Sequence, residues 1–149
     1  KWQNFTAIQP SLYTVFRMSG LGEKGSYLLL GLIGIVVFLI TWWTFRLNNR
    51  LSLNGSVFVL GNFLTMPYYI QYDLMILSIP LILLSYDCLK YGYRRIELVI
   101  LFLLWIMPLI NWPIVYLTGI QISPVVIFVV LAMTIARVRQ SQKDHSLMK

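Results

Sequence analysis

The sequence predicts an all-α protein, a polytopic transmembrane helix bundle of about five spans with an N-terminal interfacial helix. Hydrophobic residues make up 58% of the 149 residues and charged residues 11%. A soluble domain typically has about 45–50% apolar and about 25% charged residues. The apolar residues gather in five runs, and the cations gather in alternate connections between them. One small core cannot bury so much apolar side chain, so we expect a lipid bilayer as the partner.

The five spans differ in length and continuity. The first, "SYLLLGLIGIVVFLITWWTF", covers about 30 Å at roughly 1.5 Å per residue and ends in Trp42 and Trp43, as expected of an aromatic belt. Pro80 and Pro108 interrupt the third and fourth spans, and neighbouring helices must then satisfy the freed carbonyl groups. We therefore expect a packed bundle with spans at 26–45, 51–66, 74–86, 96–111 and 123–136.

Two flanking segments complete the predicted organisation. Residues 1–25 form an outer-face interfacial segment, in which "SLYTVFRMSGLG" resembles a short amphipathic helix with Leu12, Val15 and Phe16 toward lipid. Residues 137–149 form a basic cytoplasmic tail after the bundle at 26–136. Residue 1 is lysine, so we expect a processed chain or a piece of a longer one.

The cations predict the orientation in the membrane. The connections at 67–73 and 112–122 hold no lysine or arginine. By the positive-inside rule the basic side is cytoplasmic, the C-terminus included, and we expect a bacterial inner membrane. The net charge of +7 is then a topology signal, and no nucleic-acid partner is expected. Nine of the twelve basic residues fall on this side: Arg46, Arg50, Lys90, Arg94, Arg95, Arg137, Arg139, Lys143 and Lys149.

The polar segment "PYYIQYD" interrupts the apolar sequence on the opposite side and ends in Asp73. One interpretation is a sugar site, because a carboxylate accepts hydrogen bonds from hydroxyl groups and aromatic faces stack on the C–H face of a sugar ring. The other is a helix cap, in which the carboxylate satisfies free N–H groups at a helix start. The two are compatible. The residues of the candidate site beside Asp73 are Tyr68, Tyr69, Gln71 and Tyr72.

Other polar residues give weaker signals. Arg17 suits a bidentate contact with a lipid phosphate, or else snorkels toward the headgroups. Glu97 is a favourable acid in the first turn of span four, and Asp87 and Asp144 are expected to be solvated partners of nearby cations. The single histidine, His145, has no second ligand beside it, so no metal and no cofactor are expected.

The motif "LTMPYYIQYDLMILSIPLILL", with "SLYTVFRMSGLG" before it and "RRIELVILFLLWIMPLINWP" after it, resembles the C-terminal half of glycosyltransferase family 87. The resemblance covers roughly residues 2–138. Its most specific element is the Pro-Tyr followed by Tyr-Asp, and Ser11, Arg17 and Pro108 match the family pattern more loosely. The residues of the specific element are Pro67, Tyr68, Tyr72 and Asp73.

The resemblance implies an integral-membrane enzyme of the GT-C type that takes a hexose, typically mannose, from a polyprenyl-phosphate donor to an acceptor on the outer face. GT-C enzymes carry their catalytic base in the first outer loop, so the base is expected outside this chain, in a missing N-terminal half. Asp73 is not at that position. The fragment alone is then inactive, and it supplies a cavity wall at Asp73 and a phosphate contact at Arg17.

Two alternatives stay open at this stage. One is a non-catalytic membrane subunit that binds polyprenyl lipids. The other is a small transporter with Asp73 as a coupling-ion site, although no inverted repeat is visible in the sequence.

Overall fold

A computed structural model describes residues 9–47 and 50–147, with the backbone alone for Gln71 and for residues 143–147. The described residues form helices and no strand, which confirms the all-α class. In chain order the elements are α2 (Leu12–Met18), α3 (Glu23–Leu47), α4 (Leu51–Thr65), the 3-10 helix η1 (Gln71–Leu77), α5 (Ser78–Tyr91), α6 (Arg95–Thr118) and α7 (Ser123–Leu147).

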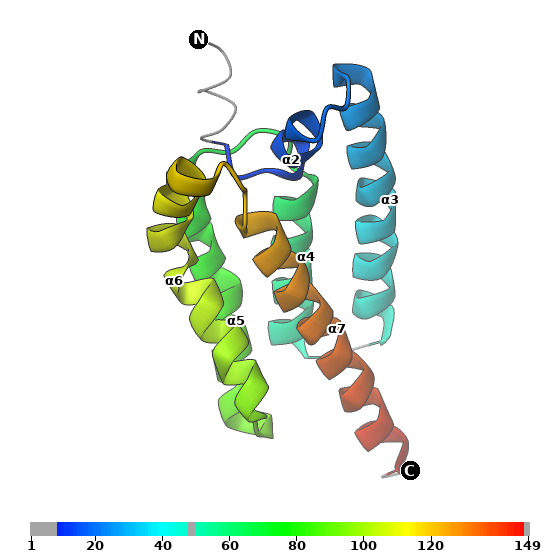
Figure 1. Cartoon of the computed structure of the whole chain (residues 1–149). Helices are drawn as coiled ribbons and strands as arrows, with labels where there is room; N and C mark the ends of the chain where they lie inside the picture. The colour runs from blue at the N-terminus through cyan, green and yellow to red at the C-terminus, as the bar shows by residue number, and fades with distance from the viewer. Residues whose placement is uncertain (1–8, 48–49, 148–149) are drawn as a thin grey trace.

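The long helices run up and down in an antiparallel bundle, and α2 lies across one end of it (Figure 1). Helix α4 occupies the centre, where it packs against α3, α5 and α7. Its buried leucines and valine recur every three or four residues, and small residues such as Ser56 and Gly61 lie between them. Small residues let helix backbones approach closely where lipid supplies no hydrophobic driving force between helices. This explains why the second span is diluted with small and polar residues.

Four helices are long and apolar enough to cross a membrane: Glu23–Leu47, Tyr72–Tyr91, Arg95–Thr118 and Ser123–Gln142. Helix α4 is shorter, and its 15 residues rise about 22 Å at 1.5 Å per residue. The five predicted spans thus correspond to four long helices around a short central one. Helix α3 exposes large apolar side chains over most of its surface, as a lipid-facing helix does. The chain is a membrane protein.

The helices extend beyond most of the predicted span boundaries, and the extensions are longest at the ends of α6 and α7. Helix α6 continues past residue 111, through Pro113, to Thr118, and Gly119 ends it in the left-handed conformation with φ of +69°. Helix α7 continues without a break past residue 136, where the sequence predicts the end of the bundle and the start of the tail. The reason is tertiary: Arg137, the first residue of that tail, is buried between helices.

The predicted interfacial helix is present as α2. Ser11 caps it by accepting a hydrogen bond from the N–H of Thr14 at 3.2 Å. Tyr13 and Thr14 form its buried face, and Leu12 packs against the core of the bundle. The hydroxyl of Ser123 donates to the carbonyl of Pro10 at 3.2 Å, which joins the start of α2 to the start of α7. The helix is therefore docked on the bundle, and the expectation that Leu12 faces lipid is wrong, because Leu12 packs against the core.

The contact between α3 and α4 generates a stability prediction at Gly61. A Cβ atom at this position would lie 2.5 Å from Cγ1 of Val37, and a β-branched side chain cannot move aside without a change of rotamer. We expect Gly61→Leu to lower the free energy of unfolding by about 1–3 kcal/mol through overpacking. Thermal unfolding of the purified chain in detergent, followed by tryptophan fluorescence, measures the change.

Gly31→Leu is the matched control, because a Cβ atom at Gly31 on α3 meets nothing within 4 Å. We expect Gly31→Leu to unfold at or above the temperature of the parent chain. Equal unfolding temperatures for the two variants would contradict the close approach of α3 and α4.

Candidate functional sites at the two ends of the bundle

The bundle has two ends, with α2 lying across one of them (Figure 1), and the two ends carry different polar side chains. The tyrosine end consists of α2, the connection 66–70 and η1, and it holds the site residues that the sequence predicts. The basic end consists of Arg50 and the start of α4, the connection 92–94, and α7 from Arg137 onward. The sequence predicts topology signals, a first-turn acid and solvated ion pairs there, yet the basic end contains the most extensive buried polar network among the described residues.

Tyr68 belongs to a cluster of three tyrosines at the tyrosine end. Its hydroxyl shares a hydrogen bond with the hydroxyl of Tyr27 on α3. The ring of Tyr13 on α2 packs against both, with centroids 4.8 Å from Tyr27 and 5.4 Å from Tyr68. The cluster thus joins α2, α3 and the connection 66–70, and half of the Tyr68 surface stays exposed. No sequence pattern marked Tyr13 and Tyr27, because each lies in a different helix.

The other two tyrosines of the predicted site, Tyr69 and Tyr72, differ in their exposure. Tyr69 is only 3% exposed, and its ring meets Phe63 edge-on at 5.0 Å. Burial raises the pKa of Tyr69 above its ordinary value, although a hydrogen bond with Ser123 lowers the pKa in part. Tyr72, by contrast, is 66% exposed. Tyr69 therefore belongs to the core, and Tyr72 is open to a ligand. The side chain of Gln71 lies outside the described residues.

Asp73 caps the start of η1. Its Oδ2 accepts a hydrogen bond from the N–H of Ile70 at 2.8 Å, and its own N–H donates to the carbonyl of Ile70 at 2.9 Å. This reciprocal pair satisfies two groups at the helix start, with the carboxylate at the third residue of η1 and not at the N-cap itself. The sequence predicts an N-cap just before residue 74, and that position is wrong: η1 begins at Gln71, and the carboxylate caps it from within the first turn. Asp73 is half-buried, so the cap leaves part of the residue exposed.

Arg17 lies at the C-terminal end of α2, exposed at the tyrosine end. Its Nη1 donates to the carbonyl of Leu21 at 3.4 Å, a bond to a neutral group of the following turn. Because the contact is long and exposed, the guanidinium can turn toward a phosphate without loss of a buried interaction.

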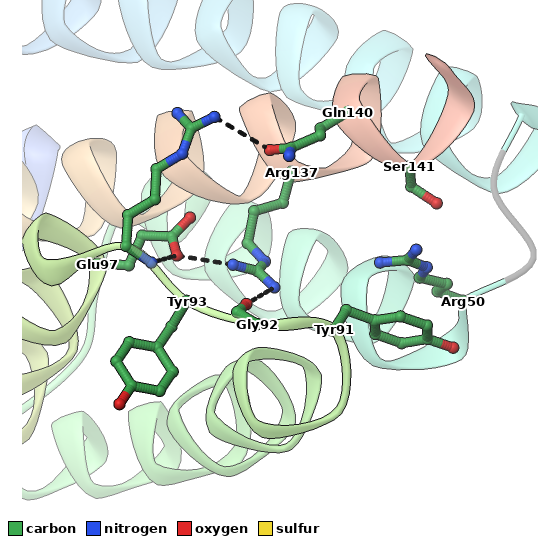
Figure 2. A pocket seen from close by; sticks show the side chains of 9 residues that line it. Arg50, Tyr91, Gly92, Tyr93, Glu97, Arg137, Gln140 and Ser141 are labelled. Carbon is green, nitrogen blue, oxygen red and sulfur yellow. Dashed lines mark hydrogen bonds and ion pairs between the residues drawn. The ribbon is translucent and has the colours of Figure 1, made fainter. Parts of the chain in front are cut away.

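At the basic end, Arg137 joins three helices. Its Nε donates to Oδ2 of Asp87 on α5 at 2.9 Å, and its Nη1 donates to Oε2 of Glu97 on α6 at 2.7 Å. Its Nη2 donates to the carbonyl of Gly92 at 3.0 Å (Figure 2). The three side chains are at most 9% exposed. Such short charge-assisted bonds, made in a fixed fork, orient the guanidinium between the helices.

A second set of contacts surrounds this network. The Ser52 hydroxyl on α4 donates to Oδ1 of Asp87 at 3.3 Å, and Nη1 of Arg50 lies 3.8 Å from the same oxygen. The N–H of Arg94 donates to Oε2 of Glu97 at 2.8 Å, which confirms the expected first-turn role of Glu97. Two buried carboxylates thus meet the buried guanidinium of Arg137 and the partly exposed one of Arg50, and the charges of the network balance.

The expectation that Asp87 is solvated is wrong. Its side chain is fully buried and bonded to Arg137, because α7 continues past residue 136 and carries that arginine back against α5. The partners are 50 residues apart in the sequence, so no local pattern could pair them. The side chain of Asp144 lies outside the described residues.

The apolar helices and their arrangement define the chain as an all-α polytopic membrane protein. Comparison with protein-family models, with curated proteins and with solved structures gives no match. The likeness to glycosyltransferase family 87 therefore rests on the motifs of the sequence alone.

The buried network generates a second stability prediction. Arg137→Leu would leave two buried carboxylates without their guanidinium partner, so we expect it to destabilise the fold by about 3–5 kcal/mol. Thermal unfolding in detergent measures the loss. Arg139→Leu removes the same charge from an exposed position two residues away, and we expect it to change stability little.

A double variant separates loss of pairing from loss of packing. Asp87→Asn combined with Arg137→Leu removes one charge of each sign, and it should unfold at a higher temperature than Arg137→Leu alone. If Arg137→Leu unfolds like Arg139→Leu, the network does not hold the helices together.

Proposed function

We propose that this chain is the C-terminal membrane portion of a glycosyltransferase that moves a hexose, of the mannose type, from a polyprenyl-phosphate donor to an acceptor on the outer face of the membrane. One observation carries the proposal. Tyr68, Tyr72 and Asp73, which belong to the most specific motif of the sequence, are all at least partly exposed in one short segment at the tyrosine end.

The chemistry of these residues suits a lipid-linked sugar. The tyrosines offer aromatic faces to a sugar ring, and the carboxylate of Asp73 offers an acceptor for its hydroxyl groups. Arg17, exposed at the same end, offers a guanidinium to the donor phosphate. Apolar helix surfaces beside them are compatible with the polyprenyl chain in the bilayer.

In this proposal Asp73 holds the sugar and does not abstract a proton. A carboxylate from the N-terminal half of the enzyme deprotonates the acceptor hydroxyl, whose oxygen then attacks the anomeric carbon. The bond from that carbon to the phosphate oxygen breaks, and polyprenyl phosphate leaves with the electron pair. The positive-inside rule puts the basic end in the cytoplasm, and hence the tyrosine end at the outer face of a bacterial inner membrane.

A non-catalytic subunit that binds polyprenyl lipid is the second candidate. It is favoured by the cap that Asp73 forms on η1, because that bond gives the carboxylate a structural role that needs no reaction. Transfer of labelled mannose from the donor by membranes that contain the native protein distinguishes the two: an enzyme transfers the sugar, and a subunit retains the donor unchanged.

Donor binding tests the site directly. We expect Arg17→Gln and Tyr72→Ala each to weaken binding of polyprenyl-phosphate mannose by about tenfold, since each removes one contact to the phosphate or the sugar. Asp73→Asn keeps an oxygen that can cap η1, so weaker binding by this variant would report on the sugar contact. Binding of the radiolabelled donor to the chain in lipid nanodiscs is the measurement.

The matched controls are Lys24→Gln, a cation lost near the same end, and Tyr116→Ala, an exposed tyrosine on α6. Both should bind the donor as the parent chain does. Unchanged binding by all three site variants would refute the proposed site.

A further inference from the structure

The basic end contains a polar cavity that the proposed reaction does not use. Its volume is about 310 Å³, and Figure 2 shows the side chains that line it. Arginines from three separate segments line it, together with two tyrosines and the polar side chains of α7. The principal lining residues are Arg50, Tyr91, Tyr93, Arg94, Arg137 and Gln140.

The charges around the cavity favour an anion. Arg137 is neutralised by its bonds to Asp87 and Glu97, and Arg50 lies 3.8 Å from Asp87. The side chain of Arg94 has a neutral partner, with Nη2 donating to Oε1 of Gln140 at 3.4 Å. Among the described residues, no ion pair within 4.0 Å involves Arg94. The long bond to Gln140 costs little to exchange for a charged acceptor.

An apolar groove of about 720 Å³ continues from this cavity between α6 and α7. The groove and the cavity share Arg94, Glu97, Arg137 and Gln140. From Val129 to Arg139 the groove follows α7 for about 15 Å at 1.5 Å per residue. Its other walls are mostly apolar: Ile96, Ile100, Val129, Ala132, Met133 and Ala136.

One cation that lines the groove also contacts a tryptophan. The guanidinium of Arg139 lines the groove and lies 5.9 Å from the ring centre of Trp43 on α3. Tryptophan and arginine together are typical of the headgroup level of a bilayer. A polar, cationic pocket at that level with an apolar groove leading from it toward the bilayer interior has the polarity of a phospholipid.

We propose that the basic end binds one anionic phospholipid. Its phosphate lies beside Arg94 and Arg139, which both line the groove, and one acyl chain lies in the groove along Val129 and Ala136. A lipid would contact both the cations and the apolar groove, whereas a free phosphate would contact the cations alone. The groove therefore favours a lipid. The site lies at the opposite end of the bundle from Asp73, so it holds whether or not the chain takes part in sugar transfer.

Lipid retention tests the proposal. The full chain is purified in neutral detergent, and bound lipid is counted by native mass spectrometry during titration with phosphatidylglycerol or with phosphatidylcholine of identical acyl chains. We expect one phosphatidylglycerol per chain, bound about tenfold more tightly than phosphatidylcholine. Equal affinity for the two lipids would overturn the proposal, and so would full displacement of phosphatidylglycerol by millimolar inorganic phosphate.

Two pairs of variants distinguish contacts with the lipid headgroup from contacts with its acyl chain. Arg94→Gln should weaken phosphatidylglycerol binding by about tenfold, whereas Arg95→Gln, which removes the same charge from a residue outside the cavity lining, should have a clearly smaller effect. Ala136→Phe fills the groove without a change of charge and should also weaken binding. Val125→Phe adds the same ring to an exposed position of α7 outside the groove and should not.

All four positions are exposed in the fold, and circular dichroism of each variant without lipid verifies that the helices are intact. The proposal would be overturned if the two members of either pair had equal effects, because lipid binding would then be non-specific. The pairs are Arg94→Gln with Arg95→Gln, and Ala136→Phe with Val125→Phe.

Discussion

The buried guanidinium of Arg137 is the constraint on which the arrangement of the helices at the basic end depends. An ion in an apolar environment is costly unless partners of opposite charge surround it with good geometry. Here the carboxylates come from two other helices, at 2.9 Å on α5 and 2.7 Å on α6. Because one rigid fork must meet both, the network fixes α7 in rotation and in height against α5 and α6. The shape of the cavity beside the network depends on that geometry, because Arg137 and Glu97 line the cavity.

A second constraint acts through α4. A helix that touches three others must carry small or well-packed side chains on the faces that meet them, and only a narrow face with residues such as Phe58 stays exposed. Gly61 permits the approach of α3, and Ser52 on the same helix reaches the ion network. The short central helix thus connects the close packing of the apolar layer to the polar contacts at the basic end. Helix α3 keeps its outer apolar surface for the bilayer.

The two ends of the bundle can serve different ligands because the bundle keeps them apart. At the tyrosine end, side chains from α2, α3 and the connection 66–70 form an aromatic surface around Tyr68, with the carboxylate of Asp73 near it in sequence. At the basic end, cations surround a polar cavity that continues into an apolar groove. A sugar suits the first surface and an anionic lipid suits the second, and each can be tested without disturbing the other.

The sequence by itself determined the all-α class and the approximate positions of the apolar helices, because hydropathy depends on residues close together in the chain. It also indicated a capping role for Asp73, although η1 begins before that residue, at Gln71. Only the tertiary structure decided that α4 is central, that Tyr69 is buried while Tyr72 is exposed, and that Asp87 meets Arg137 from 50 residues away. Helices that are apolar on all sides carry little periodic information about which face meets a neighbour. Packing between helices and the pairing of buried charges determine which faces meet, and the sequence pattern does not contain that information.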